Sequence, residues 1–254
     1  MLVTAAAGMI AAGAVPAQAA SENYVALGDS YSAGTGAGDY GASGMCVRSA
    51  NAYPALWAKA HATTSFKFVA CAGAKTGDVL DTQLGALTAQ TTLVTLSIGG
   101  NDVGFAGMMA TCATGTEKMC VDRIEQAKAS ARAELPGKLD KTYAAIKDRA
   151  PKARVIVLGY PRIFMSGSAF CPMGQGKRTA LNDGADELSK VISERVRAAG
   201  LTYEDVRDDF DGHGVCSAKP WMNGLVLRNI VESYHPNKAG QANGYYQALA
   251  HALG

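Results

Sequence analysis

The sequence has very little net charge. Its 24 Lys and Arg residues nearly balance its 22 Asp and Glu residues, which leaves a formal charge of +2 over 254 residues. Proteins that bind nucleic acid carry basic patches, and the short run Lys177-Arg178 is typical of solvated surface instead. We therefore expect no nucleic-acid partner. Hydrophobic residues make up 48% of the chain and charged residues 18%, which is ordinary for a globular protein with a sizeable core.

Metal-binding and cofactor-binding patterns are also missing. The chain has four histidines and no Cys-x-x-Cys pair or His-rich cluster, so a zinc site is not expected. The run 208–213 (DDFDGH) lacks the Glu and the regular spacing of a calcium loop, which favours a polar loop around His213. Residues 36–41 spell G-x-G-x-x-G, but a dinucleotide fingerprint must follow its strand directly and open a helix. We expect no metal and no cofactor.

The first twenty residues contain no charged side chain. They are rich in Ala, Gly and Val and end in Ala17-Gln18-Ala19, a small-x-small pattern of the kind that signal peptidase cuts. The pattern predicts that residues 1–20 are a signal peptide, that the mature chain begins near Ala20, and that the protein is secreted. The alternative is an N-terminal membrane anchor, for which the stretch is near the short limit.

Six cysteines follow that segment. An even number of cysteines behind an export signal predicts disulfides, because thiols are oxidised outside the cytosol. Six cysteines allow fifteen pairings, and their spacing alone does not choose among them. We favour sequential pairing, because it closes three separate local loops: Cys46–Cys71, Cys112–Cys120 and Cys171–Cys216.

Short apolar runs alternate with segments of helical periodicity. Strands are predicted at Tyr24–Leu27, Phe66–Ala70, Leu93–Ile98, Val155–Gly159 and Leu201–Val206. Helices are predicted at Tyr53–Ala62, Val121–Ala150, Arg178–Ala199 and Lys238–Leu253. Several of the strand runs are continuously apolar, which is typical of strands buried on both faces. This alternation predicts a three-layer α/β/α sandwich with a five-stranded parallel sheet. No repeat or linker divides residues 21–254, so we expect a single domain.

In such sheets, functional sites gather beyond the carboxyl ends of the strands. Ser30 follows the first predicted strand directly, where its hydroxyl and nearby backbone N–H groups could face a developing anion. The alternative is that Ser30 only caps the next helix. His235 stands before Pro236, which disfavours a helical conformation and predicts a loop at a helix entrance. A serine activated by a neighbouring histidine is the minimal pair for acyl transfer.

Four blocks in order resemble those of the GDSL, or SGNH, hydrolase family. They are Gly28–Ser32 (GDSYS), Gly73 within CAGA, Gly99–Asp102 (GGND) and Glu232–Pro236 (ESYHP). Together they span almost the whole chain beyond residue 20. With six cysteines and an export signal, the chain is most similar to the secreted actinobacterial lipases and phospholipases of that family. The resemblance implies a flavodoxin-like SGNH hydrolase fold.

The resemblance also implies a role for each block. Ser30 would attack an ester carbonyl and His235 would carry the proton to the leaving alcohol. The oxyanion would be held by the backbone N–H groups of Ser30 and Gly73 and by the Asn101 amide. Taken singly, Gly73 and Asn101 are equally explained as turn residues. The family usually has Asp three residues before the histidine, where this chain has Glu232; either Glu232 or the backbone carbonyl of Ser233 would orient His235.

Apolar residues near the motifs indicate the kind of substrate. Flexible or aromatic side chains follow two predicted strand ends and could line an acyl groove, although each alone could be core: Phe105, Met108, Met109, Ile163, Phe164 and Met165. We therefore expect a serine carboxylic-ester hydrolase, a lipase or esterase with possible phospholipase A activity, acting as a monomer in transient contact with lipid. The alternatives are a carbohydrate esterase, for acetyl or feruloyl groups, and a non-catalytic exported binding module.

Overall fold

The computed structural model describes residues 22–61 and 63–254, so the predicted signal peptide lies outside the described residues. Five parallel strands form one sheet in the order β2-β1-β3-β4-β5. The strands are β1 (Glu22–Ala26), β2 (Thr63–Phe68), β3 (Leu93–Leu96), β4 (Arg154–Leu158) and β5 (Thr202–Glu204). All five overlap the predicted strands, and the predicted α/β sandwich with a five-stranded parallel sheet is confirmed.

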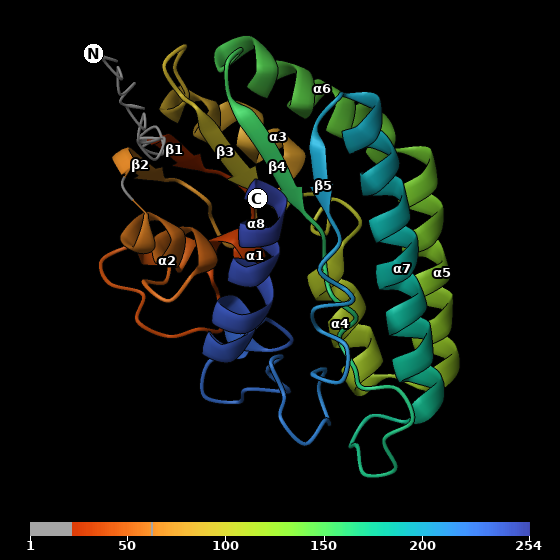
Figure 1. The fold of residues 1–254 in the computed structure, drawn as a ribbon. Coiled ribbons are helices and arrows are strands. Elements are labelled where there is room, and N and C mark those ends of the chain that lie inside the picture. The colour runs from red at the N-terminus through yellow and green to blue at the C-terminus, as the bar shows by residue number, and fades with distance from the viewer. Residues whose placement is uncertain (1–21, 62) are drawn as a thin grey trace, which may run out of the picture.

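Helices cover both faces of the sheet (Figure 1). On one face α2 (Tyr53–Ala60) packs against α8 (Tyr246–Leu253), and α8 also contacts β4 and β5. On the other face α6 (Leu135–Arg149) and α7 (Gln175–Ala198) lie together, with α5 (Glu117–Ala133) packed against α7. All four residues of β3 are buried, because this strand lies at the centre of the sheet between two helical layers.

The helix predicted at Val121–Ala150 is wrong as a single element. The chain forms α5 and α6 instead, which meet at Glu134. Pro136 stands in the first turn of α6, where its missing N–H costs nothing, but inside one long helix its ring would clash with the preceding turn. A further helix, α4 (Phe105–Thr114), was not predicted. The segment predicted at Lys238–Leu253 begins as a π-helical turn (Gly240–Tyr245) before α8.

Short helical segments lie at the loops beyond the sheet. They are α1 (Ser30–Ala33), α3 (Thr76–Asp78), a π-helical turn at Val79–Gln83 and 3₁₀ turns at Gly44–Cys46, Leu84–Ala86 and Ile230–Glu232. Among residues 22–61 and 63–254, no helix combines the length and the apolar character that crossing a bilayer requires.

The strand order places a topological switch point between β1 and β3. From β1 the chain moves outward to β2 and then crosses back to β3 on the other side of β1. Loops that leave adjacent strands in opposite directions open a crevice between them, and in open α/β sheets ligands bind there. Ser30 follows β1 and Asn101 follows β3, so both flank this crevice.

Candidate active site

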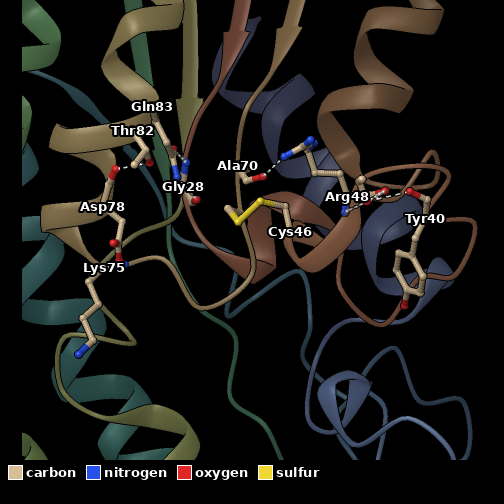
Figure 2. The surroundings of a disulfide bond; sticks show 11 residues. Gly28, Tyr40, Cys46, Arg48, Ala70, Lys75, Asp78, Thr82 and Gln83 are labelled. Atoms are coloured by element: carbon tan, nitrogen blue, oxygen red, sulfur yellow. Dashed lines mark hydrogen bonds between the residues drawn. A yellow bond between two sulfur atoms is a disulfide. The ribbon is translucent and has the colours of Figure 1, made fainter.

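The backbone around Ser30 is held in one conformation. Gly28 has φ +116, and a Cβ at that position would lie 2.5 Å from the carbonyl oxygen of Ser97, so only glycine fits. The side-chain amide of Gln83 accepts from the Gly28 N–H at 2.7 Å and donates to its carbonyl at 2.9 Å, as Figure 2 shows. Asp29, and not Ser30, is the N-cap of α1. Ser30 is therefore the first helical residue, and its N–H has no acceptor within the helix.

Ser30 and His235 are in hydrogen-bond contact although 205 residues separate them in sequence. Ser30 Oγ lies 2.8 Å from His235 Nε2, and both residues are buried. On its other side the imidazole Nδ1 lies 3.0 Å from the backbone carbonyl of Ser233. A donor at Nδ1 leaves Nε2 as the acceptor, which is the tautomer that can take a proton from a serine hydroxyl.

Tyr31 fixes the segment that carries the histidine. Its hydroxyl donates to the carbonyl of Tyr234 at 3.0 Å, and its ring centroid lies 5.1 Å from that of His235. Tyr234 has φ +61, an uncommon value for a residue with a side chain. This backbone conformation occurs between Ser233 and His235, where it helps one short segment supply both the imidazole and its acceptor.

Glu232 does not contact the imidazole with its carboxylate. Its Oε1 accepts a hydrogen bond from the Tyr40 hydroxyl at 2.6 Å and another from Asn229 Nδ2 at 3.0 Å. Glu232 therefore ties the loop that contains Tyr40 to the loop that precedes His235. Of the two acceptors considered for His235 Nδ1, the structure places only the Ser233 carbonyl within hydrogen-bond distance.

Burial shifts the pKa values of two groups in opposite directions. Loss of solvent lowers the pKa of His235 to about 4, although the Ser233 carbonyl and the charge of Glu232 partly oppose the shift. His235 is therefore neutral, as a proton acceptor must be. Burial raises the pKa of Asp29 to about 6, against hydrogen bonds from Tyr160 and Ser97 that favour its charged form.

Asp29 links the loop after β1 to the loop after β3. Its carboxylate accepts from the Tyr160 hydroxyl and, at 2.7 Å, from Ser97 Oγ. The Tyr160 hydroxyl in turn accepts from the N–H of Gly100 at 3.2 Å. This chain of hydrogen bonds holds the residue before Ser30 against the residue before Asn101. It was not anticipated from the sequence, because nothing in the pattern pairs Asp29 with Tyr160.

Gly73 and Asn101 lie on loops that are joined to each other. Asn101 Nδ2 donates to the carbonyl of Ala74 at 3.0 Å, which orients the amide and leaves its second N–H available. Asp102 accepts from both the N–H and the hydroxyl of Thr76, at 3.0 and 2.6 Å. Gly73 has φ +80, and a Cβ there would meet nothing within 4 Å, so its backbone borders open space.

A disulfide anchors the Gly73 loop. Cys46 is bonded to Cys71, and Arg48 donates to the carbonyl of Ala70, as Figure 2 shows. The N–H of Ala72 also donates to the carbonyl of Cys46, at 3.0 Å. The other bridges join Cys112 to Cys120 and Cys171 to Cys216, so the six cysteines form the sequential pairs expected from the sequence.

An apolar pocket opens beside Ser30 and Asn101. We call it the apolar pocket. The loops after the strands and α4 contribute Val103, Phe105, Met108, Tyr160, Pro161 and Ile163, while α5 and α7 contribute Ala127, Lys128, Ala131, Leu181, Gly184, Ala185 and Leu188.

The expected groove residues are only partly found in this pocket. Phe105, Met108 and Ile163 line it, whereas Met109 is buried in the core and Phe164 lines a different hollow next to Tyr234. The contribution of α5 and α7 was not predicted. A small or apolar side chain at every third or fourth helical position is equally the pattern of an ordinary packing face, so the sequence held no separate signal.

Other sequence features have local structural roles. The ring of His213 stacks on Trp221 with centroids 3.7 Å apart, and its Nδ1 lies 2.8 Å from the carbonyl of Lys219. The loop at residues 36–41 packs beside the histidine segment, since the Gly36 carbonyl accepts from Asn223 Nδ2. In the described part of the chain no cluster of three or more His, Cys, Asp or Glu side chains could hold a metal ion.

A parallel α/β sandwich with a paired serine and histidine at its switch point is the arrangement typical of serine hydrolases built on an α/β fold. Residues 26–242 match the GDSL-like lipase/acylhydrolase family. The chain therefore belongs to that family and is a carboxylic ester hydrolase.

Relatives in Streptomyces are close to this chain. Lipase 1 of Streptomyces coelicolor is 51% identical over 249 residues, covering 96% of this chain and 93% of the relative. A lipase of Streptomyces rimosus is 47% identical, covering 89% and 85%. The crystal structure of phospholipase A1 from Streptomyces albidoflavus NA297 superposes with a TM-score of 0.89 at 47% identity, covering 92% of this chain and all of the other.

Proposed function

We propose that the protein hydrolyses acyl esters through a Ser30–His235 dyad whose imidazole is oriented by the Ser233 carbonyl. The observation that carries the proposal is the pair of contacts at His235, 2.8 Å from Nε2 to Ser30 Oγ and 3.0 Å from Nδ1 to Ser233 O. Neutral His235 accepts the Ser30 proton while Oγ bonds to the ester carbonyl carbon. The imidazolium then returns that proton to the leaving alcohol, and an acyl-enzyme remains.

Water completes the cycle by the same route. His235 removes a proton from the water that attacks the acyl-enzyme carbonyl, and it returns the proton to Ser30 Oγ as the fatty acid leaves. During both steps the carbonyl oxygen becomes an anion. The backbone N–H groups of Ser30 and Gly73 and the free N–H of the Asn101 amide are the donors that we assign to it.

The hydrogen bonds around these donors support that assignment. The Ala74 carbonyl holds the Asn101 amide, and the Thr76–Asp102 pair holds the Gly73 loop against it. A preorganised donor stabilises the transition state because no reorientation is needed when the charge develops.

The substrate that the apolar pocket fits best is an ester with a medium or long acyl chain. Its lining is dominated by aliphatic and aromatic side chains next to Ser30, which suits a hydrocarbon chain better than an acetylated sugar. The similarity to phospholipase A1 of S. albidoflavus supports phospholipid esters as one such substrate.

We further propose that the enzyme is secreted and acts as a monomer. Three disulfides and an uncharged N-terminal segment that ends in Ala17-Gln18-Ala19 support export after removal of residues 1–20. Residues 21–254 would then form one hydrolase domain. One chain supplies both members of the dyad, so the proposed chemistry needs no second copy of the chain.

The test compares the wild type with Ser30→Ala on a nitrophenyl-ester chain-length series and on a phospholipid. We expect turnover of every ester to fall by about ten-thousandfold or more. Ser65→Ala, at an exposed position on β2, is the matched control and should retain full activity. Equal activity in Ser30→Ala and wild type would refute the dyad. A preference for two-carbon over eight- to twelve-carbon esters would refute the acyl-chain substrate.

A further inference from the structure

Large hydrophobic side chains are exposed in one short loop. Within residues 22–61 and 63–254, seven such side chains are exposed, and four of them lie in the 225–231 loop: Leu225 (53%), Leu227 (83%), Ile230 (61%) and Val231 (46%). A soluble chain rarely exposes a contiguous apolar surface unless something binds there. The 225–231 loop is therefore a candidate binding surface.

The loop is fastened at its base to the active site. Ser233 Oγ accepts from the N–H of Val226 at 2.9 Å, and the N–H of Asn223 donates to the carbonyl of His235 at 2.9 Å. These bonds close the loop on the segment that carries the dyad histidine. The apolar side chains are thus exposed on a loop whose base is bonded to the segment that carries His235.

Two further exposed side chains flank the loop. Phe170, 95% exposed, precedes Cys171, and Cys171 and Pro172 line the same hollow as Gly224 and Leu225. Met45, 92% exposed, precedes Cys46 on the loop that Tyr40 joins to Glu232. Disulfides fasten both neighbours, Cys171 to Cys216 and Cys46 to Cys71.

The charged residues that adjoin the loop in sequence are mainly basic. Between residues 217 and 238 the basic side chains are Lys219, Arg228 and Lys238, all exposed. The single acidic side chain there is Glu232, whose carboxylate is hydrogen-bonded to Tyr40 and Asn229. Arg228 stands between Leu227 and Ile230, where an anionic head group could meet it while its neighbours enter the acyl layer.

We propose that the 225–231 loop, flanked by Phe170 and Met45, is a docking surface for lipid aggregates that carry anionic head groups. The proposal rests on the proposed lipid-ester function and adds where the enzyme contacts its substrate phase. Docking through this loop brings the head-group layer next to the entrance of the dyad. The apolar pocket can then receive an acyl chain without the chain crossing bulk water.

Docking is measured separately from catalysis in the Ser30→Ala background. Its sedimentation with vesicles of phosphatidylcholine mixed with phosphatidylglycerol is compared with that of the same protein carrying Leu227→Ser and Ile230→Ser. Removing two apolar side chains from an interface should weaken vesicle partition about tenfold or more. Unchanged partition would overturn the proposal, whatever the outcome for Ser30.

Two charge-reversal variants test the role of Arg228. Arg228→Glu and Lys152→Glu change the net charge equally, but Lys152 is exposed in the turn before β4, at the amino end of a strand whose carboxyl end faces the site. We expect vesicle partition to fall for Arg228→Glu and to stay near the parent value for Lys152→Glu. Equal losses in both variants would mean that only the overall charge matters, and would overturn the assignment of the surface.

The last experiment places Leu227→Ser and Ile230→Ser in the chain that retains Ser30 and compares its ester hydrolysis with that of the wild type. This variant should hydrolyse a dissolved butyrate ester as fast as the wild type and vesicle lipid at least about tenfold more slowly. Equal losses on both substrates would show that the loop serves the site and not docking. A wild-type dimer that these substitutions split into monomers would show that a second copy of the chain occupies the surface.

Discussion

Replacing Ala185 with leucine should shorten the acyl chain that the enzyme prefers. Ala185 is buried on α7 and lines the apolar pocket with Gly184, opposite Ala127 and Ala131 of α5. Small side chains on both facing helices are what leave the pocket open. The substitution Ala185→Leu adds three carbon atoms to that space.

The magnitude follows from the hydrocarbon that the pocket holds. Each methylene of the substrate that moves from water into the pocket contributes about 0.8 kcal/mol, or about fourfold in kcat/KM. The carbons added by Ala185→Leu displace about three methylenes, so esters that fill the pocket should lose about 2.4 kcal/mol, or roughly sixtyfold. Esters too short to reach Ala185 should be hydrolysed as in the wild type.

The assay is kcat/KM over a nitrophenyl-ester series from two to twelve carbons, with a thermal melt of each variant. Ala198→Leu is the matched control, because it makes the same change at an exposed position of the same helix. The expected result is a profile that matches wild type for short chains and drops for long ones. A uniform loss at every length, or an unchanged profile in a folded variant, would refute the pocket as the acyl site.

The remaining predictions concern the dyad and its surroundings. Asn101→Ala removes one oxyanion donor, so kcat should fall about a hundredfold to a thousandfold, and a change below about threefold would contradict the assignment. Glu232→Gln should reduce turnover by less than about tenfold, because its carboxylate contacts Tyr40 and Asn229 and not the imidazole; a thousandfold fall with the structure intact would make Glu232 the orienting group. The lowered pKa of His235, about 4, keeps the base neutral down to mildly acidic pH, so kcat/KM should fall only as the pH drops through about 4; a limb at the ordinary value of 6.5 would contradict this. Gly36→Ala places a Cβ 2.9 Å from the Pro236 carbonyl and 3.0 Å from the His235 Cβ, so kcat should fall with little change in the melting temperature, and full activity would be inconsistent with that packing.

The sequence predicted the sheet well for a physical reason. Apolar runs such as Leu93–Ile98 must be buried on both faces, and no other arrangement buries them as simply. The break between α5 and α6 was missed although Pro136 marks it, because the helical periodicity continues on both sides of Glu134. The helix α4 was missed because Gly104 and Gly107 weaken its local helical signal.

In the candidate site, too, some features were predicted from the sequence and others were not. Ser30, Gly73 and Asn101 stand in short motifs at strand ends and His235 stands before the last helix, and the resemblance of these motifs to the family's blocks is what grouped them. Contacts between distant segments had no such signal. The bond from Tyr160 to Asp29 and the bond from Tyr40 to Glu232 depend on how loops fold over one another, which local patterns do not encode.

The two members of the proposed dyad come from opposite ends of the described chain. Ester hydrolysis should therefore be detectable only when both ends of the chain have folded into place. Ser30 is placed by the first strand, whereas His235 enters with the last twenty residues, 205 positions later. A nascent or truncated chain that has formed the sheet around β1 and β3 still has a serine without its proton acceptor. On the proposed mechanism, such a chain cannot hydrolyse esters until its C-terminal segment has docked. Recovery of ester hydrolysis during refolding would therefore report when that segment has docked.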